Sequence, residues 1–444
     1  MSPLRRLFAL LPLLALLLAG CAHVVDGEQD QICRRALPAV IETRGSVRLL
    51  ARIQSDPQQV TLYFSLDKPD EAHRLICDFA ASGVSLAKRD LTGVEIDGYA
   101  LSPSALHFLR EGWLHSQASV TAAPRPERGL VLANLTPPVA YGLQQTLSAL
   151  PRMGIYALIA AAFSLLYGLT GRINLAFGAF VALGGITAVL AMRAIDALGL
   201  SSLPVLLAGG AFAASTTAGL FGTATARLMI APLSRRPGQH VLVASAGLML
   251  VLEEFLRLSQ GARTLWLAPV LNLPFLVAAA PGFDVTITPV ALAVSITALG
   301  MALTLLVMLR SARFGLFWRA ASDDAGAAEL FGVGRDALVA ETFSLAASVA
   351  GFAGFLVALH YGGIGFAGGT SLGLTALVAA ILGGIGSIGG ALVGGALVGL
   401  VEAAWSSLMP MVYTDGVVFL LLAVLLALRP GGLLSGRQPG PMRV

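Results

Sequence analysis

One run of glycines in this chain has the spacing of a nucleotide-binding turn. Gly384-Ile-Gly386-Ser-Ile-Gly389 matches the dinucleotide fingerprint. That motif follows a strand in a soluble βαβ unit, and an acid about twenty residues later binds the ribose. Glu402 comes too early for this role, Asp415 comes too late, and apolar residues flank the run on both sides. The glycines therefore favour close helix packing, around a broken helix near Ser387, over nucleotide binding.

Small residues continue after this run in a repeat that suits helix contacts. Gly390-Ala-Leu-Val-Gly394 is followed at once by Gly395-Ala-Leu-Val-Gly399. Such small-xxx-small faces let two helix backbones touch. The expected packing positions are Gly384, Gly386, Gly390, Gly394, Gly395 and Gly399.

The residues needed for nucleotide hydrolysis are missing from the apolar part of the chain. A P-loop needs a lysine that reaches the terminal phosphates. No lysine occurs from Pro137 to Pro430, and only His240 and His360 occur there as histidines. We therefore expect no catalytic site, metal or cofactor in this part. Active transport would need energy from a partner or an ion gradient. A basic cluster with interleaved aromatics is also absent, which argues against nucleic-acid binding.

The acids and one amide inside apolar stretches are the next candidates for functional residues. Charges within a membrane are costly and usually face a cavity or a partner. Glu253, Glu254 and Glu341 lie where they could reach a membrane surface, so Glu402 is the strongest candidate for a functional buried acid. Asn174 stands at the edge of the second stretch. It could cap the following helix or lie beside a substrate path.

The segment from Arg310 to Asp336 is the one long, highly charged loop between apolar stretches. An aspartate pair can cap a short helix within it, and a glycine can end that helix. A solvated loop would not need an exposed Leu-Phe pair. A short helix in a groove of another protein would explain both the charges and the apolar face. The expected docking residues are Arg319, Asp323, Asp324, Glu329, Leu330, Phe331 and Gly332.

Long apolar stretches must position these residues. Hydrophobic residues make up 56% of the chain and charged residues 12%, and there are 50 glycines, which is typical of packed transmembrane helices. We expect an all-α polytopic membrane protein with about eight or nine transmembrane helices, preceded by a small soluble α/β domain. The expected spans are 139–170, 174–195, 203–229, 241–258, 286–309, 338–360, 373–388, 389–406 and 414–428.

The arginines predict the orientation of these spans. Most of them fall in loops on one side, including Arg172, Arg227, Arg235 and Arg335, whereas Arg193, Arg257 and Arg263 fall on the other. The positive-inside rule then places the N-terminal domain outside and the C-terminus in the cytoplasm. The segment 373–406 keeps this sidedness either as two spans or as a re-entrant hairpin.

Residues 1–20 predict an export signal. Arg5 and Arg6 precede an apolar run whose length, about 20 Å as a helix, is short of the roughly 30 Å hydrocarbon core. Leu18-Ala-Gly-Cys21 resembles a lipobox, which would attach lipid to Cys21. An ordinary cleaved signal and an uncleaved anchor are the alternatives. Cys33 and Cys77, the other two cysteines, could pair in an oxidising compartment or remain unpaired thiols.

Residues 22–135 predict a periplasmic α/β domain and linker. Alternating apolar residues predict strands near 47–53 and 60–66. Asp67 is a candidate cap for a helix from Pro69 to Gly83, and Ser102-Pro103 opens another helix. His73, His107 and His115 in this domain lack ligand spacing, so no metal site is expected. The stretch from Thr121 to Leu135 is the predicted linker.

Several segments, in order along 139–435, resemble the branched-chain amino acid ABC transporter permeases. They begin at Ile155 (through Ala176), Ala231, Ser245, Phe314, Leu330 and Ala379. The resemblance implies a permease domain at 137–435 in the bacterial inner membrane, with a cytoplasmic tail at 436–444. It also implies a second permease subunit, cytoplasmic ATPases and a periplasmic substrate-binding protein as partners. The charged loop would then be the coupling helix that meets the ATPase.

Two departures from the family pattern bear on function. Where the family typically reads Asn-Phe-Ala-His-Gly-Glu, this chain has Asn174-Leu-Ala-Phe-Gly-Ala179, so a titratable and a charged group are missing. The transported solute could therefore be a branched-chain amino acid, urea, an amide or another small solute. The exported domain is also unusual, and it could bind substrate, dock a binding protein or only anchor. The expected path residues are Asn174, Phe177, Gly178, Ala179 and Glu402.

These observations favour the permease subunit of an ABC importer for a small polar solute. The rival class is a stand-alone secondary transporter or channel. That class would transport without an ATPase and would carry paired charges at mid-membrane, of which the sequence shows few.

Overall fold

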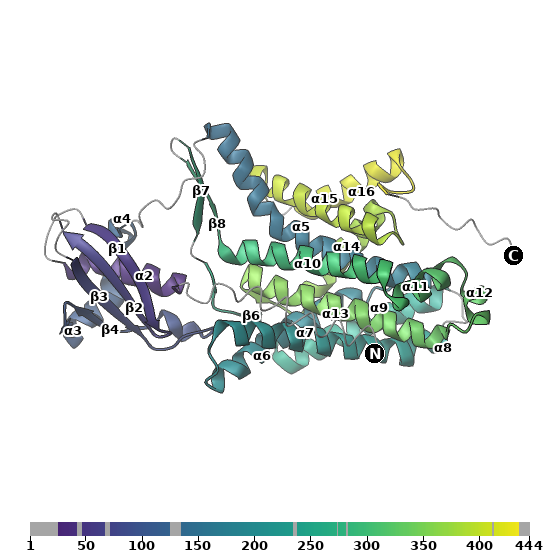
Figure 1. Cartoon of the computed structure of the whole chain (residues 1–444), viewed down its shortest axis with the longest axis horizontal. Coiled ribbons are helices and arrows are strands. Elements are labelled where there is room, and N and C mark those ends of the chain that lie inside the picture. The colour runs from purple at the N-terminus through teal and green to yellow at the C-terminus, as the bar shows by residue number, and fades with distance from the viewer. Residues whose placement is uncertain are drawn as a thin grey trace.

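The computed structural model describes residues 25–41, 47–66, 72–124, 135–233, 238–272, 274–280, 283–410 and 413–434. A small sheet domain lies at one end of an elongated molecule and a helical bundle forms the rest (Figure 1). The export signal, Cys21, the proposed cap Asp67, most of the linker and the tail 436–444 lie outside the described residues.

The sheet domain is built on five antiparallel strands in the order β1-β2-β3-β4-β5. Helix α2 (Gly27–Val40) packs against this sheet, and Val60, Leu62 and Phe64 are fully buried in the core between them. The two strands predicted from alternating apolar residues are confirmed. The strands are β1 (Val47–Asp56), β2 (Gln59–Leu66), β3 (Ala72–Phe79), β4 (Leu91–Ile96) and β5 (Tyr99–Ala100).

The helix expected from Pro69 to Gly83 is wrong, because the described part of this segment is strand β3. Its pairing register places Leu75 opposite Leu62 and Cys77 opposite Val60, and β4 pairs on its other side. Leu75, Cys77 and Phe79 are buried at two-residue spacing. Leu75 and Phe79 also fit a helical spacing, so the apolar pattern was ambiguous over this short run. This segment lies between β2 and β4, so the extended conformation gives its backbone hydrogen bonds on both edges.

The helix predicted at Ser102-Pro103 is confirmed as α3 (Pro103–Phe108). The Ser102 hydroxyl accepts a hydrogen bond from the Ala105 amide at 3.4 Å. The chain continues as a helical turn, η2 (Leu109–Trp113), in which the Trp113 indole donates to the Arg35 carbonyl of α2 at 2.7 Å. A last short helix, α4 (Gln117–Ala122), follows.

The bundle is mostly helical, as expected, and six of its helices are long and apolar enough to cross a membrane within the described residues. They are α5 (Pro137–Thr170), α6 (Phe177–Ala197), α7 (Leu203–Thr225, continuing to Leu233), α10 (Pro289–Ser311), α13 (Arg335–Tyr361) and α15 (Ile388–Leu408). Further helices include α9 (Gly238–Gln260), α14 (Gly368–Gly383) and α16 (Thr414–Leu428). Helix α14 spans about 24 Å at 1.5 Å per residue, less than a bilayer core.

Helix α13 lies at the centre of the bundle, and its most apolar stretch of 18 residues is entirely buried. It meets α6 where two glycines face each other: a Cβ on Gly184 would lie 2.2 Å from the Gly351 Cα. Without side chains at this crossing the two backbones touch, which is the usual way to pack helices where lipid gives no hydrophobic driving force.

Short strands join the helices at the end of the bundle nearest the sheet domain. β7 (Phe275–Ala280) pairs with β8 (Phe283–Ile287), and β6 (Leu265–Trp266) pairs with β9 (Gly363–Ile364). The fifth span was expected from residue 286, but β8 occupies that position and α10 begins at Pro289 after the cap Thr288. The apolar residues of the strand run into those of the helix, so hydropathy could not separate them.

The sheet domain rests directly on this end of the bundle. Val84 belongs to the apolar core of the bundle, and its carbonyl accepts from the Ala268 amide at 3.4 Å. Gly83, with φ +72°, packs so closely on the last turn of α6 that a Cβ would lie 2.7 Å from the Asp196 carboxylate. The two parts therefore form a packed interface.

Candidate functional site

The charged segment between α10 and α13 folds into two helices, α11 (Arg313–Asp323) and α12 (Ala325–Leu330). Asp324 caps α12: its Oδ1 accepts from the Ala327 amide at 2.9 Å. Gly332 follows with φ +88°, the left-handed conformation that ends a helix. The short capped helix predicted here is confirmed, and the cap is Asp324 rather than its exposed neighbour Asp323.

An apolar pair projects from the end of α12. Leu330 and Phe331 are each 90% exposed, whereas Ala328 on the opposite face is buried. Glu329 is exposed beside them, and a hollow of about 560 Å³ is lined by Glu329 and residues 332–337. Exposed leucine and phenylalanine side chains next to a hollow are typical of a docking surface.

Helix α11 connects this surface to the membrane helices. The Trp318 indole donates to the Leu165 carbonyl of α5 at 3.2 Å and fills the space beside Gly168, where a Cβ would lie 2.7 Å from the ring. Gly386, in the turn before α15, borders the same point. Helix α11 therefore packs directly against the end of α5, next to that turn. Arg319 donates to the Leu309 carbonyl, so it holds the corner between α10 and α11.

The glycine-rich run forms a turn flanked by two closely packed helices. Gly384 and Gly386 have φ of +106° and +88° and make the turn, and Ser387 caps α15 by accepting from the Gly390 amide at 3.2 Å. A Cβ on Gly394 would lie 2.1 Å from the Ala379 carbonyl of α14, and one on Gly395 would lie 2.4 Å from the Ala157 Cα of α5. Gly390 and Gly399 contact α14 and α5 in the same way. The helix breaks near Ser387, these four glycines lie against neighbouring helices, and Gly384 and Gly386 form the turn between α14 and α15.

The predicted path residues at the start of α6 are packed inside the bundle. Phe177 is 1% exposed, with edge-to-face contacts to Phe163 and Phe180 at centroid distances of 5.6 and 6.4 Å. Gly178 crosses α14 so tightly that a Cβ would lie 2.1 Å from the Gly369 carbonyl. Ala179 is also buried. The start of α6 is thus fixed against the start of α14.

Asn174 lies just before α6 and is 4% exposed. Its Oδ1 accepts from the Ala176 amide at 3.0 Å, so it orders the turn that leads into the helix. Its Nδ2 is buried and has no hydrogen-bond partner in the described part of the chain. The N-cap of α6 is Ala176, without a side-chain cap hydrogen bond, so Asn174 orders the turn before the helix and keeps one unsatisfied donor.

The predicted acid Glu402 belongs to a polar cluster that the sequence did not reveal. Arg152 of α5 donates to the Ser406 hydroxyl of α15 at 3.2 Å. Tyr156, one turn along α5, interacts with Glu402, and Tyr361 at the end of α13 interacts with both Arg152 and Glu402. Three helices thus place an arginine, a glutamate and two phenols together. An arginine inside the first apolar stretch was the available signal, because intramembrane charges face partners or cavities.

The other acids have different surroundings. Glu253 of α9 accepts from the Thr370 hydroxyl at 3.3 Å, and Glu254 pairs with the exposed Arg257 at 2.7 Å. Glu341 lines a cavity of about 470 Å³ together with Arg227 and Asp336. None of the described histidines, cysteines and acids group by three or more in a way that could hold a metal ion.

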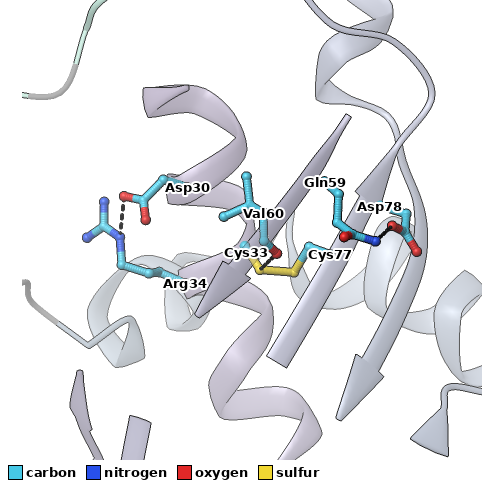
Figure 2. The surroundings of a disulfide bond; sticks show 7 residues. All are labelled: Asp30, Cys33, Arg34, Gln59, Val60, Cys77 and Asp78. Carbon is cyan, nitrogen blue, oxygen red and sulfur yellow. Dashed lines mark hydrogen bonds and ion pairs between the residues drawn. A yellow bond between two sulfur atoms is a disulfide. The ribbon is translucent and has the colours of Figure 1, made fainter. Parts of the chain in front are cut away.

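Two of the three cysteines are joined in the sheet domain (Figure 2). A disulfide connects Cys33 of α2 to Cys77 of β3, with a Cα–Cα distance of 5.9 Å. Both residues are fully buried. The bond thus links the helix to the middle of the sheet.

A family profile described as "Branched-chain amino acid transport system / permease component" matches residues 145–427. The high-affinity branched-chain amino acid transport system permease protein LivH of Salmonella typhimurium is 32% identical over 295 residues, which are 66% of this chain and 96% of that protein. LivH of Escherichia coli K12 shows the same identity and coverage. BraD of Pseudomonas aeruginosa, of the same description, is 30% identical over 301 residues, 67% of this chain and 97% of BraD. No solved structure matches the chain.

Proposed function

The chain belongs to the branched-chain amino acid transport system permease family, and we propose that it is the translocation subunit of an ABC importer driven by separate ATPases. The observation that carries the ATPase partnership is the exposed apolar pair, Leu330 and Phe331, on the capped helix α12. Two large apolar side chains exposed to water at a helix end are unfavourable unless a partner covers them. The contact of Trp318 with α5 supports a role in transmitting the motion of that partner.

The proposal includes a topology and a set of partners. The sheet domain lies outside, the α11–α12 segment and the C-terminus lie in the cytoplasm, and eight or nine spans cross the inner membrane. Family membership supports a second permease subunit and a substrate-binding protein as further partners. The packed interface of the sheet domain favours a fixed module on the outer face of the bundle. An acylated Cys21 would tether that face to lipid.

The solute is a small polar compound, most simply a branched-chain amino acid or a related molecule. The relatives LivH and BraD are branched-chain amino acid permeases by name. Phe177 and Ala179 offer no group for a charged solute, so recognition has to come from other residues. A stand-alone secondary transporter or channel is the alternative, and it would carry solute without ATP.

The test changes the docking pair. Replacing Leu330 and Phe331 with aspartate should abolish solute-stimulated ATP hydrolysis by the complex isolated from native membranes, while the chain still inserts. A matched control, Leu330→Met with Phe331→Leu, keeps an apolar surface and should retain stimulation. ATP-independent transport by the purified chain would instead support the alternative.

The orientation is tested by cysteine labelling in intact spheroplasts. Both Asp90 and Asp323 are exposed. Asp90→Cys should react with a membrane-impermeant thiol reagent, whereas Asp323→Cys should react only after lysis. The reverse pattern would overturn the proposed sidedness.

A further inference from the structure

The polar cluster around Arg152 and Glu402 carries opposite charges on two helices that contact each other closely. Gly399 of α15 lies against Met153, the residue after Arg152, where a Cβ would be 2.6 Å from the Met153 amide. The two charged residues therefore lie close to a backbone crossing between two membrane helices. Both residues are partly buried, and no ion pair with an N–O distance up to 4.0 Å joins them in the described structure.

Hydroxyl groups lie beside the two charges. Tyr156 is 7% exposed and interacts with Glu402, Tyr361 interacts with both charged residues, and Ser406 accepts from Arg152. His360 packs edge-to-face on Tyr361 at a centroid distance of 4.8 Å. These partners reduce the cost of two charges in an apolar setting, but they carry no formal charge of their own.

The surroundings leave further hydrogen-bonding capacity. Trp405, in the same turn of α15 as Glu402 and Ser406, has a buried Nε1 without a partner among the described residues. A guanidinium has five N–H donors in a planar fork, and its interactions with Ser406 and Tyr361 use only part of it. Polar groups that are partly buried and incompletely paired favour a ligand that completes their hydrogen bonds.

We propose that the Arg152–Glu402 cluster recognises the head group of a zwitterionic α-amino acid, with Arg152 binding the carboxylate and Glu402 binding the ammonium. This inference rests on the proposed permease function and names the solute class for it. A zwitterion satisfies both charges at once, whereas an amide leaves Arg152 without its anion and a simple acid leaves Glu402 without its cation. Urea satisfies neither.

The cluster also accounts for the missing His and Glu at the start of α6. The groups that could pair with a charged solute are absent at Phe177 and Ala179, whose side chains are buried. Arg152 and Glu402 supply one positive and one negative group elsewhere in the same chain. Selectivity for a zwitterion then does not require charged residues from a second subunit.

The test measures binding to the purified full chain in lipid nanodiscs by saturation-transfer difference NMR, without ATP or partners. Leucine should give a signal at least about tenfold stronger than leucinamide or 4-methylpentanoate, since a site built for a polar group rejects analogues that lack it. Arg152→Gln should remove the preference over leucinamide, and Glu402→Gln the preference over 4-methylpentanoate. Arg263→Gln, a change at an exposed arginine, should keep the wild-type pattern.

A merely structural cluster would give a different result. It would predict equal losses for every probe in both variants, or no change, and either result overturns the inference. Absence of a leucine signal from folded wild-type protein also overturns it. Where a glutamine variant fails to fold, Arg152→Lys and Glu402→Asp retain the charge and should weaken leucine binding without altering the order of the probes. Because this readout needs no ATP hydrolysis, its failure is separate from failure of the coupling test.

Discussion

Lys88 of the sheet domain donates a hydrogen bond from Nζ to the backbone carbonyl of Pro269, which lies 181 residues further along the chain in the bundle. The ammonium is fully buried and forms ion pairs with Asp26 at 2.9 Å and with Glu28 at 3.6 Å. A buried cation with two acidic partners and a carbonyl is fully satisfied only while the domain is docked. Lys88 therefore ties the sheet domain to the loop between β6 and β7.

Replacing Lys88 with methionine should loosen this interface. Removing one partner of a buried charge pair costs about 3 kcal/mol or more, because Asp26 is left without a counter-charge and Glu28 keeps only Arg89. Hydrogen exchange of residues 265–271 should then increase strongly. Arg110→Met, a change at an exposed cation of the same domain, should have no effect there. Equal protection in both variants would show that the Lys88 contacts do not hold the domain.

The cap of α12 offers a matched pair of substitutions. Asp324→Ala removes the side chain that binds the Ala327 amide and should destabilise the helix by about 1 kcal/mol. Asp323→Ala removes a neighbouring aspartate that does not cap α12, so the helix should be unchanged. Faster exchange of the amides of residues 327–331 in the first variant alone would agree with this assignment. Similar exchange rates in the two variants would contradict it.

The bundle and its docking segment could be predicted from sequence because their signals are local. The lengths of the apolar stretches predict most of the helices. The aspartate pair and Gly332 predict α12 without knowledge of any tertiary contact. The strand at Ala72–Phe79 was missed because its apolar spacing also suits a helix, and only its pairing with β2 and β4 decides between them. The local pattern there was ambiguous.

The polar cluster could not be predicted for a different reason. Arg152 and Ser406, which are hydrogen-bonded, are 254 residues apart in sequence. Their meeting depends on how α5 packs against α15 through Gly395 and Gly399. The sequence indicated the small residues and the single acid, but not which helix they would face.

The disulfide should contribute substantially to the stability of the sheet domain. It closes a sequence separation of 44 residues between α2 and β3, and loss of a native disulfide in a small domain typically costs about 2–5 kcal/mol. Cys33→Ala with Cys77→Ala should make this domain sensitive to protease at a lower urea concentration. The helical bundle should be unaffected, because both cysteines lie in the separate core of the sheet domain. Adding reductant to the wild type should reproduce the change, and adding it to the double variant should do nothing.

The crossing of α6 and α14 at Gly178 gives the sharpest test of packing. A Cβ at this position would lie 2.1 Å from the Gly369 carbonyl and 2.9 Å from the Gly373 Cα, and backbone atoms cannot rotate away as a side chain can. Gly178→Ala should therefore force the two helices apart and destabilise the protein by about 1–3 kcal/mol.

Gly247 is the matched control for this substitution. It lies within helix α9, and a Cβ there would meet nothing within 4 Å. Gly247→Ala should be neutral or should stabilise the helix by up to about 1 kcal/mol, because alanine loses less backbone entropy. The midpoint of thermal unfolding in detergent, followed by size-exclusion fluorescence, should fall for Gly178→Ala only. If the two variants melt alike, the start of α6 does not touch α14. Phe177 and Ala179 would then be free to face a path, because the contact that holds this turn inside the bundle would be missing.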